Sequence, residues 1–286
     1  MRAVKRSLSP GVGAGSPCRA PLRGANALIL AAGRGARLGT GAPKCLAPIG
    51  GRTLVEPQLD ALEEVGVDDV TIVVGFQADA VSDIVAGRAR LVLNERYAET
   101  NSLYSFLLGC DAVASGGFVI NADVLFESSI LARIVTSGQG AVAFDSCSGD
   151  DDEHMKVALQ GIRLVEMRKD LERRRTCGEN LGLLRLGRRA ASTTIAAARA
   201  IVAAGGQNDW LASAVNVAAV AHVIRCVDVA GTPWIEIDYP EDLERARRDV
   251  WPRIAEGLLE GTHPAATARD GSRHARLQLA AGHATA

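Results

Sequence analysis

A short apolar segment that runs directly into a glycine-rich, basic loop constrains the fold of this chain more than any other feature. Residues 27–32 (ALILAA) are apolar throughout, which is typical of a short strand buried on both faces. Residues 33–44 (GRGARLGTGAPK) follow without a break and combine four glycines with Arg37 and Lys44. Glycines let backbone N–H groups approach phosphate oxygens, and the cations neutralise phosphate charge. The segment therefore predicts a βα turn that binds a polyphosphate.

Two other phosphate-binding loops fit this segment less well. A Walker loop ends in Gly-Lys-Ser/Thr, which is absent from the segment. The dinucleotide fingerprint requires a small residue at the position that Leu38 occupies. An NAD-dependent dehydrogenase, which would bind NAD without needing a metal, is therefore a distant alternative.

Strand and helix patterns alternate from residue 27 to about residue 257. The β-branched run at residues 70–74 indicates a buried strand, and residues 53–65 and 101–113 have the pattern of helices. This alternation predicts an α/β fold with a Rossmann-like, mostly parallel sheet and helices on both faces. A small antiparallel β insert is indicated by three strand patterns joined by polar loops: residues 156–159, 162–167 and 181–186.

The two ends of the chain differ in composition from the part between them. Residues 1–25 carry five basic residues and no acidic one, without the apolar stretch of a secretory signal, and we expect a flexible leader. Residues 261–286 lack apolar periodicity and predict a disordered tail. Residues 26–260 are expected to form one domain.

Charge and composition exclude several classes of partner. The net charge of -1 gives no reason to expect a nucleic acid or an anionic membrane surface. No apolar run reaches the roughly 20 residues of a membrane span. The 6 cysteines are scattered without metal-ligand spacing, which favours reduced thiols and a cytoplasmic location.

Two aspartates follow predicted strands and are candidate metal ligands. Asp123 comes after residues 118–122, and Asp238 comes after residues 234–237. Open α/β sheets bind ligands at the carboxyl ends of their strands, and Mg²⁺ prefers carboxylate, phosphate and water oxygens. The pair therefore predicts one Mg²⁺ site beside the polyphosphate. Strand alternation places Glu236 on the same face as Asp238.

The first βα unit, LILAAGRGARLGTGAPKCLAPIGGRTLVE, resembles the nucleotidyltransferase superfamily of sugar-phosphate nucleotidylyltransferases. The short loop between Arg37 and Pro43 is most similar to that of phosphocholine and phosphonate cytidylyltransferases. The resemblance implies the nucleotide-diphospho-sugar transferase type of fold and metal ligation by Asp123 and Asp238. It implies catalytic contacts of Arg37 and Lys44 with the phosphates, and nucleotide binding by the same two residues and by Leu30, Ala31, Ala32, Gly33 and Gly35.

Two further segments carry the same resemblance. Residues 94–105 (NERYAETNSLYS) are similar to a cytidylyltransferase segment, and Asn101 and Ser102 are expected at a nucleotide-binding helix start. The "MKV" step brings in Lys156 as a third catalytic cation. Acceptor-binding residues are expected from the acidic loop, the "GENLG" segment, a tryptophan and the last strand: Asp152, Glu179, Asn180, Trp210 and Glu236.

These observations predict a Mg²⁺-dependent cytidylyltransferase. The expected reaction transfers CMP from CTP to a small phosphonate or phosphorylated alcohol, resembling aminoethylphosphonate or phosphocholine, and releases pyrophosphate. A sugar-1-phosphate nucleotidyltransferase that uses another NTP shares the loop and the metal ligands and is the nearest alternative. A non-catalytic nucleotide-sensing module is the second alternative, and a homodimer is a candidate assembly.

Overall fold

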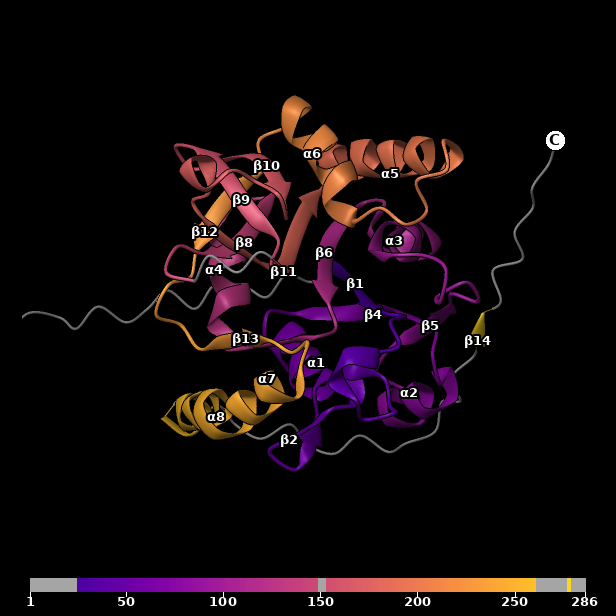
Figure 1. Cartoon of the computed structure of the whole chain (residues 1–286), viewed down its shortest axis with the longest axis vertical. Helices are drawn as coiled ribbons and strands as arrows, with labels where there is room; N and C mark the ends of the chain where they lie inside the picture. The colour runs from indigo at the N-terminus through magenta and orange to yellow at the C-terminus, as the bar shows by residue number, and fades with distance from the viewer. Residues whose placement is uncertain (1–24, 149–152, 261–276, 279–286) are drawn as a thin grey trace, which may run out of the picture.

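The structure is a computed structural model that describes residues 25–148, 153–260 and 277–278. It confirms the expected α/β fold, in which helices pack on both faces of a central sheet (Figure 1). The strands are β1 Ala25–Ala31, β2 Pro48–Ile49, β3 Arg52–Thr53, β4 Val67–Val74, β5 Arg90–Leu93, β6 Gly116–Asn121, β7 Val124–Phe126, β8 Ala141–Asp145, β9 Lys156–Gln160, β10 Arg163–Arg168, β11 Gly178–Gly187, β12 Arg225–Asp228, β13 Trp234–Glu236 and β14 Leu277–Gln278. The α-helices are α1 Val55–Glu64, α2 Ala78–Val85, α3 Ser102–Gly109, α4 Ser129–Ser137, α5 Arg188–Ala203, α6 Leu211–Ala221, α7 Pro240–Arg245 and α8 Trp251–Glu260. Short 3₁₀ segments are η1 Ala36–Leu38, η2 Lys44–Leu46, η3 Cys110–Val113 and η4 Arg173–Arg175, and η5 Ala246–Val250 is a π-helical turn.

The main sheet is mixed, and its strand order is β14-β5-β4-β1-β6-β11-β8-β12-β10-β9. Strands β5, β4, β1 and β6 are parallel neighbours, as the βα alternation predicts. Strand β11 is antiparallel to both β6 and β8, in the middle of the sheet. It follows the antiparallel β9–β10 hairpin rather than a crossover helix, so it enters the sheet in the opposite direction. The three strands of the expected antiparallel insert are therefore present as β9, β10 and β11, and they join the main sheet.

Alternation along β1 divides the core between the two faces of the sheet. Ala27, Ile29 and Ala31 belong to a buried cluster with α1, α2 and α4. Leu28 belongs to a second cluster with α3, α5 and α6. A strand covered by helices on both sides must be apolar at every position, which explains why ALILAA has no polar alternation.

The last predicted strand lies outside the main sheet. Strand β13 pairs with β7 in a separate two-stranded antiparallel ribbon and takes no place in the main sheet. The ribbon packs with α7 and α8 in a third, smaller apolar cluster that includes Leu125, Ile235 and Ile254. Asp238 therefore reaches Asp123 through the ribbon, and not through the edge where parallel strands end.

The predicted helix at residues 101–113 is shorter in the structure. α3 ends at Gly109 and continues as η3. A Cβ atom at Gly109 would lie 2.5 Å from a Leu28 methyl carbon, so the helix approaches the sheet closely at this point.

Among the described residues, no helix is both long and apolar enough to cross a membrane. The predicted leader and tail lie outside the described residues, except for Ala25 and residues 277–278.

A buried glutamine on α1 holds the turn between β6 and β7. Gln58 is 1% exposed, and its Nε2 donates to the carbonyl oxygens of Asn121 at 3.0 Å and Val124 at 2.7 Å. These two carbonyls flank the turn that carries Asp123. The side chain therefore links the folding of α1 to the geometry of the predicted metal ligand.

We expect Gln58→Leu to lower the free energy of unfolding by about 2 kcal/mol, because two buried carbonyls lose their donor. Urea denaturation measures the change, with an unchanged slope expected. The exposed Gln160→Ala variant is the matched control and should lie within about 0.5 kcal/mol of the parent. An unchanged midpoint for Gln58→Leu would show that the turn does not depend on this donor.

Candidate functional site

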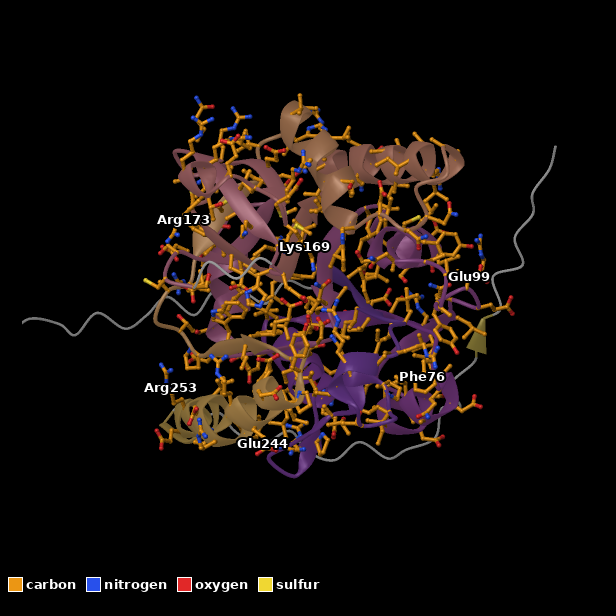
Figure 2. The ribbon with its side chains drawn as sticks, in the orientation of Figure 1. Phe76, Glu99, Lys169, Arg173, Glu244 and Arg253 are labelled. Atoms are coloured by element: carbon orange, nitrogen blue, oxygen red, sulfur yellow. The ribbon has the colours of Figure 1, made fainter. Side chains whose placement is uncertain are left out.

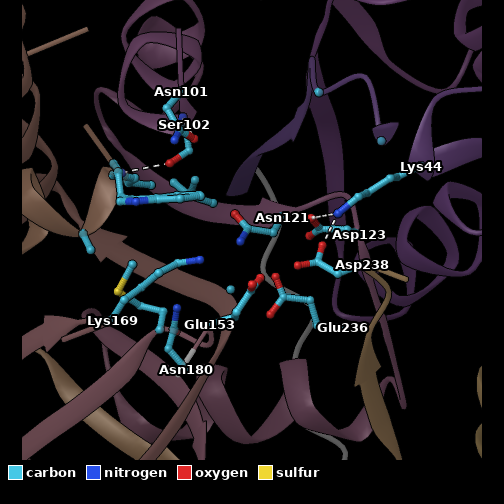
Figure 3. Close-up of a pocket in the computed structure, with 18 of the residues that line it drawn as sticks. Lys44, Asn101, Ser102, Asn121, Asp123, Glu153, Lys169, Asn180, Glu236 and Asp238 are labelled. Atoms are coloured by element: carbon cyan, nitrogen blue, oxygen red, sulfur yellow. Dashed lines mark hydrogen bonds and ion pairs between the residues drawn. The ribbon is translucent and has the colours of Figure 1, made fainter. Parts of the chain in front are cut away.

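A cavity of about 480 Å³ opens where β1 and β6 end and faces the antiparallel strands (Figure 3). One wall comes from the glycine-rich loop, the start of α3 and the β6–β7 turn. The opposite wall comes from the residues just before β9, from β10 and β11, and from the start of α6. A smaller cavity of about 160 Å³ adjoins it at the end of β1 and is lined by Leu30, Ala32 and Asn101, among others.

The glycine-rich loop folds around Lys44. Gly35 has φ of 60°, and a Cβ atom at this position would lie 2.6 Å from Lys44 Cγ. Glycine is therefore required both by the backbone conformation and by the close approach of the lysine stem. Gly33, Gly35, Arg37 and Lys44 all line the cavity, as the sequence predicts. Ala31, predicted to bind nucleotide, faces the other side of β1 in the core with α1.

Three carboxylates meet at one point of the cavity. Oxygen atoms of Asp123, Glu236 and Asp238 all lie within 4.8 Å of one another. The backbone explains the convergence: Glu236 pairs with Val124 across the ribbon, and the Ile237 N–H donates to the Asp123 carbonyl at 2.8 Å. Glu236 and Asp238 are two positions apart, so they lie on the same face, beside Asp123. Glu236 thus joins the two aspartates that the sequence predicts as metal ligands.

The Lys44 ammonium lies between the two aspartates. It pairs with Asp238 and lies 3.6 Å from Asp123 Oδ2 (Figure 3). Burial acts to lower the pKa of Lys44, but the charges of Asp123 and Asp238 outweigh burial and raise it. Lys44 is therefore a fixed cation, and one positive charge faces three carboxylates.

Burial and mutual repulsion make this carboxylate group hard to ionise fully. Burial raises the pKa of Asp123, against the opposing effect of Lys44. Burial, with the neighbouring Asp123 and Asp238, raises the pKa of Glu236 to about 8. Asp123 Oδ1 is buried and has no hydrogen-bond partner among the described residues. A hard oxygen donor set with excess negative charge and an unsatisfied oxygen fits a divalent cation such as Mg²⁺.

The start of α3 forms the next part of the wall. Asn101 Oδ1 accepts from the Ser102 N–H at 2.8 Å and caps the helix. Ser102 Oγ accepts from the Leu211 N–H at 2.9 Å and so ties the start of α6 to the start of α3. Both residues line the cavity, as predicted, but Asn101 Oδ1 and Ser102 Oγ are each already engaged in one protein contact.

The opposite wall contains some of the predicted acceptor residues. Asn180 and Trp210 line the cavity on this wall, whereas Glu236 lines it beside Asp123 and Asp238. Asn180 Oδ1 is buried without a hydrogen-bond partner in the described part of the chain. Trp210 is 44% exposed at the rim of the cavity. Asp152 lies outside the described residues.

Glu179 faces a different space from its neighbour Asn180, because adjacent strand residues point to opposite faces. It lines a second cavity of about 410 Å³ together with His154, Trp234 and Glu236. His154 Nδ1 lies 2.8 Å from Glu179 Oε1. Glu236 borders both cavities, so it is the carboxylate that separates them.

The cation on the acceptor wall is Lys169, which the sequence analysis did not select. The predicted Lys156 is 8% exposed and is not among the residues that line the cavity. Lys169 follows β10, lies with its Nζ 4.5 Å from the centre of the Trp210 ring, and points into the cavity with Asn180 (Figure 3). It stands in a polar turn, MRKDLE, that has no strand or helix periodicity to indicate its direction. Glu153 and Asn121 also line the cavity and were not predicted.

Comparisons with known proteins agree with this arrangement. The sequence profile of the MobA-like NTP transferase domain matches residues 27–217. The chain is 28% identical over 282 residues to a CMP-5'-(3-aminopropyl)phosphonate synthase of Streptomyces rubellomurinus, covering 87% of this chain and 42% of that protein. It is 32% identical over 269 residues to a bifunctional IPC transferase and DIPP synthase of Rubrobacter xylanophilus, covering 88% of this chain and 56% of that protein. The chain thus spans about half the length of these two curated relatives.

A solved structure supports the fold. The CTP:phosphocholine cytidylyltransferase of Streptococcus pneumoniae superposes with a TM-score of 0.65 at 21% identity, over 78% of this chain and 97% of that one. Together with the sequence relatives, this likeness confirms the resemblance to nucleotidyltransferases and the nucleotide-diphospho-sugar transferase type of fold.

The raised pKa of Glu236 predicts a pH dependence of stability in the metal-free protein. Between pH 4.5 and about 8 the folded protein keeps a proton on Glu236 that the unfolded chain has released. The folded state then binds more protons, so this contribution to stability is lost as pH rises through that window. With a chelator present, the free energy of unfolding of Glu236→Gln, relative to that of the parent, should increase by more than about 1 kcal/mol from pH 5 to pH 8.

Urea denaturation at the two pH values measures the gain. Glu64→Gln, an exposed change on α1, is the control and should show no such gain. A constant difference between Glu236→Gln and the parent across this range would mean that Glu236 ionises normally in the folded protein.

Proposed function

The chain belongs to the MobA-like NTP transferase family and is therefore a nucleotidyltransferase, and from this premise we propose that it transfers CMP from CTP to a small phosphonate or phosphorylated alcohol. The observation that carries the proposal is a single cavity shared by the glycine-rich loop, Lys44 and three carboxylates. CMP and a phosphonate are in the name of the Streptomyces relative, which supports the choice of nucleotide and acceptor.

We assign the triphosphate to the glycine-rich loop. Gly33 and Gly35 leave backbone N–H groups accessible, and Arg37 adds an exposed cation at the rim. Arg37 pairs with Glu153 and stacks on Tyr239 with its guanidinium carbon 5.6 Å from the ring centre. A triphosphate that attracts Arg37 must compete with these two contacts. The nucleoside then extends toward Asn101, Ser102 and the smaller cavity.

In the proposed reaction, an acceptor oxygen attacks the α-phosphorus of CTP. A new P–O bond forms, the bond from the α-phosphorus to the bridging oxygen breaks, and pyrophosphate leaves with the bonding electron pair. A phosphate or phosphonate oxygen is anionic at neutral pH, so the reaction needs no general base. Catalysis rests on positioning and on charge neutralisation by fixed groups such as Lys44.

We assign Mg²⁺ to Asp123, Glu236 and Asp238. A bound Mg²⁺ supplies charge neutralisation at the α-phosphate and at the departing pyrophosphate. Lys44 contacts two of these carboxylates, so it keeps them aligned and limits their repulsion. Glu236 must lose its proton before it can serve as a ligand, so metal affinity should rise with pH up to about 8.

We assign the acceptor to the opposite wall, where Lys169 and Asn180 face the cavity. Lys169 can neutralise an acceptor phosphonate that would otherwise be repelled by the α-phosphate, which is the part the sequence suggested for Lys156. Trp210 holds the Lys169 ammonium from one side and limits its range. Glu179 then acts behind this wall, through His154 and Glu236, and not as a direct acceptor contact.

We also propose that residues 26–260 make up the catalytic domain and that it works in the cytoplasm, as the scattered cysteines suggest.

Pyrophosphate release measured with the four common NTPs, each against aminoethylphosphonate, phosphocholine and glucose 1-phosphate, tests the proposed function. We expect turnover with CTP and a phosphonate or phosphorylated alcohol, and loss of turnover with a chelator. Preference for a sugar 1-phosphate with UTP, GTP or dTTP would replace the proposal by the sugar-nucleotide alternative. Nucleotide binding without turnover for any pair would favour the sensing module.

We expect Lys44→Ala and Asp123→Asn each to lower kcat about 100-fold or more, because each removes charge stabilisation at the reacting phosphate. Steady-state kinetics at saturating Mg²⁺ measures the loss. Arg189→Ala, an exposed change at the first turn of α5, serves as the control and should keep the parent rate. Near-parent rates for either site variant would contradict the assignment.

We expect Lys169→Ala to raise the KM for the acceptor and lower kcat, together by about ten-fold or more, while the KM for CTP stays within about three-fold. Lys156→Met should instead change the free energy of unfolding more than the kinetic constants, because Lys156 is buried outside the cavity. If Lys156→Met instead changed kcat and the KM for the acceptor while Lys169→Ala did not, Lys156 would be the acceptor-side cation.

A further inference from the structure

The turn between β4 and α2 contacts the glycine-rich loop near both of its ends. This turn, residues 75–77, consists of Gly75, Phe76 and Gln77 and is called the β4–α2 turn below. The Arg34 guanidinium carbon lies 5.7 Å from the centre of the Phe76 ring (Phe76 is labelled in Figure 2). Gln77 Nε2 donates to the Gly41 carbonyl oxygen at 3.0 Å. The two contacts bracket the part of the loop that carries Arg37.

Gln77 contacts Gly41 from a backbone conformation that is unfavourable for residues other than glycine. Its φ of 48° and ψ of 48° are left-handed, and it is the one residue other than glycine with positive φ in the described part of the chain. A side chain with a Cβ atom resists this conformation, and glycine would adopt it freely. Such strain persists where the surrounding structure requires it, and it concentrates at ligand-binding positions.

Gly75 lets the same turn pack closely on Ala32, the residue that precedes the glycine-rich loop. A Cβ atom at Gly75 would lie 2.7 Å from the Ala32 carbonyl oxygen and 2.6 Å from Tyr97 Cβ. The Phe76 N–H donates to the Ala32 carbonyl at 3.4 Å, and the Phe76 and Tyr97 rings lie 6.2 Å apart. Tyr97 lines both the main and the smaller cavity. One short turn therefore contacts the start of the loop, its far end and a wall residue of the nucleotide side.

We propose that the β4–α2 turn is a clamp that holds the glycine-rich loop in the shape that receives the triphosphate, with Gln77 as its positioning residue. Gln77 is not among the residues that line the cavity, so it acts through Gly41 and the loop backbone. A loop held in its binding shape loses less conformational entropy when the nucleotide binds, so the clamp should lower the KM for CTP. The kinetic part of this inference rests on the proposed function.

The test uses Gln77→Gly and Gln77→Asn in the full chain with Mg²⁺. Glycine removes both the strain and the amide, and asparagine tolerates the conformation but is one methylene too short to keep the Gly41 contact. We expect a rise of about five-fold in the KM for CTP in both variants, as for one lost hydrogen bond. The kcat and the acceptor KM should stay within about two-fold, and the midpoint of thermal unfolding should be unchanged or higher. A merely structural residue would instead lower the midpoint, and that result would overturn the proposal.

Limited trypsin digestion without substrates tests the clamp independently of any reaction. Cleavage after Arg34 and Arg37 reports how often the loop opens, and it should be about three-fold faster or more in both variants. Gln160→Ala, an exposed glutamine on the β9–β10 hairpin, is the matched control and should match the parent. Unchanged cleavage would overturn the clamp. Faster cleavage in a protein that releases no pyrophosphate with any NTP would support the clamp while rejecting the proposed function.

Discussion

The contact of one lysine with two aspartates from distant parts of the chain is the interaction on which the rest of the site depends. Lys44 comes from the first βα turn, Asp123 from the end of β6, and Asp238 from the residues after β13. Without the ammonium, three carboxylates would face one another within 4.8 Å, and burial would keep at least one of them protonated. The remaining excess of negative charge would attract a divalent cation, which supplies positive charge that Lys44 alone cannot and would let an anionic polyphosphate bind beside the carboxylates.

Sequence reasoning was most successful where local chemistry decides the structure. Residues 27–44 contain an apolar strand and a glycine-rich turn whose geometry follows from their own composition, and the structure brings Gly33, Gly35, Arg37 and Lys44 to the same cavity. The sequence analysis selected Lys156 and not Lys169 for a physical reason. Lys156 stands in a strand whose pattern is readable, whereas the direction of Lys169 is set by a turn packed against Trp210, a contact between residues far apart in the sequence. The pairing of β13 with β7 is equally non-local, since β-pattern alone does not say which sheet a strand joins.

The mixed sheet gives the two walls of the cavity a different construction. The wall that carries the glycine-rich loop is built on parallel strands buried between helices, where ALILAA leaves little freedom. The opposite wall is built on β10, β11 and the residues before β9, and the additional pairing of β11 with β9 closes this end of the main sheet on itself. Turns at the ends of these antiparallel strands carry residues such as Lys169, and turns can change with little effect on a packed core. Residues of this wall can therefore change while the wall with the glycine-rich loop stays the same.

The wide separation of Lys44 and Asp238, 194 residues apart, also has a consequence for how the protein is made. As the chain leaves the ribosome, the loop and Asp123 emerge long before Glu236 and Asp238. A nascent chain that has folded β1, β4 and β6 thus presents its lysine with only one of its three acidic partners. Premature termination before residue 236 would yield a product that keeps the phosphate loop but has lost two of the three groups suited to hold the cation.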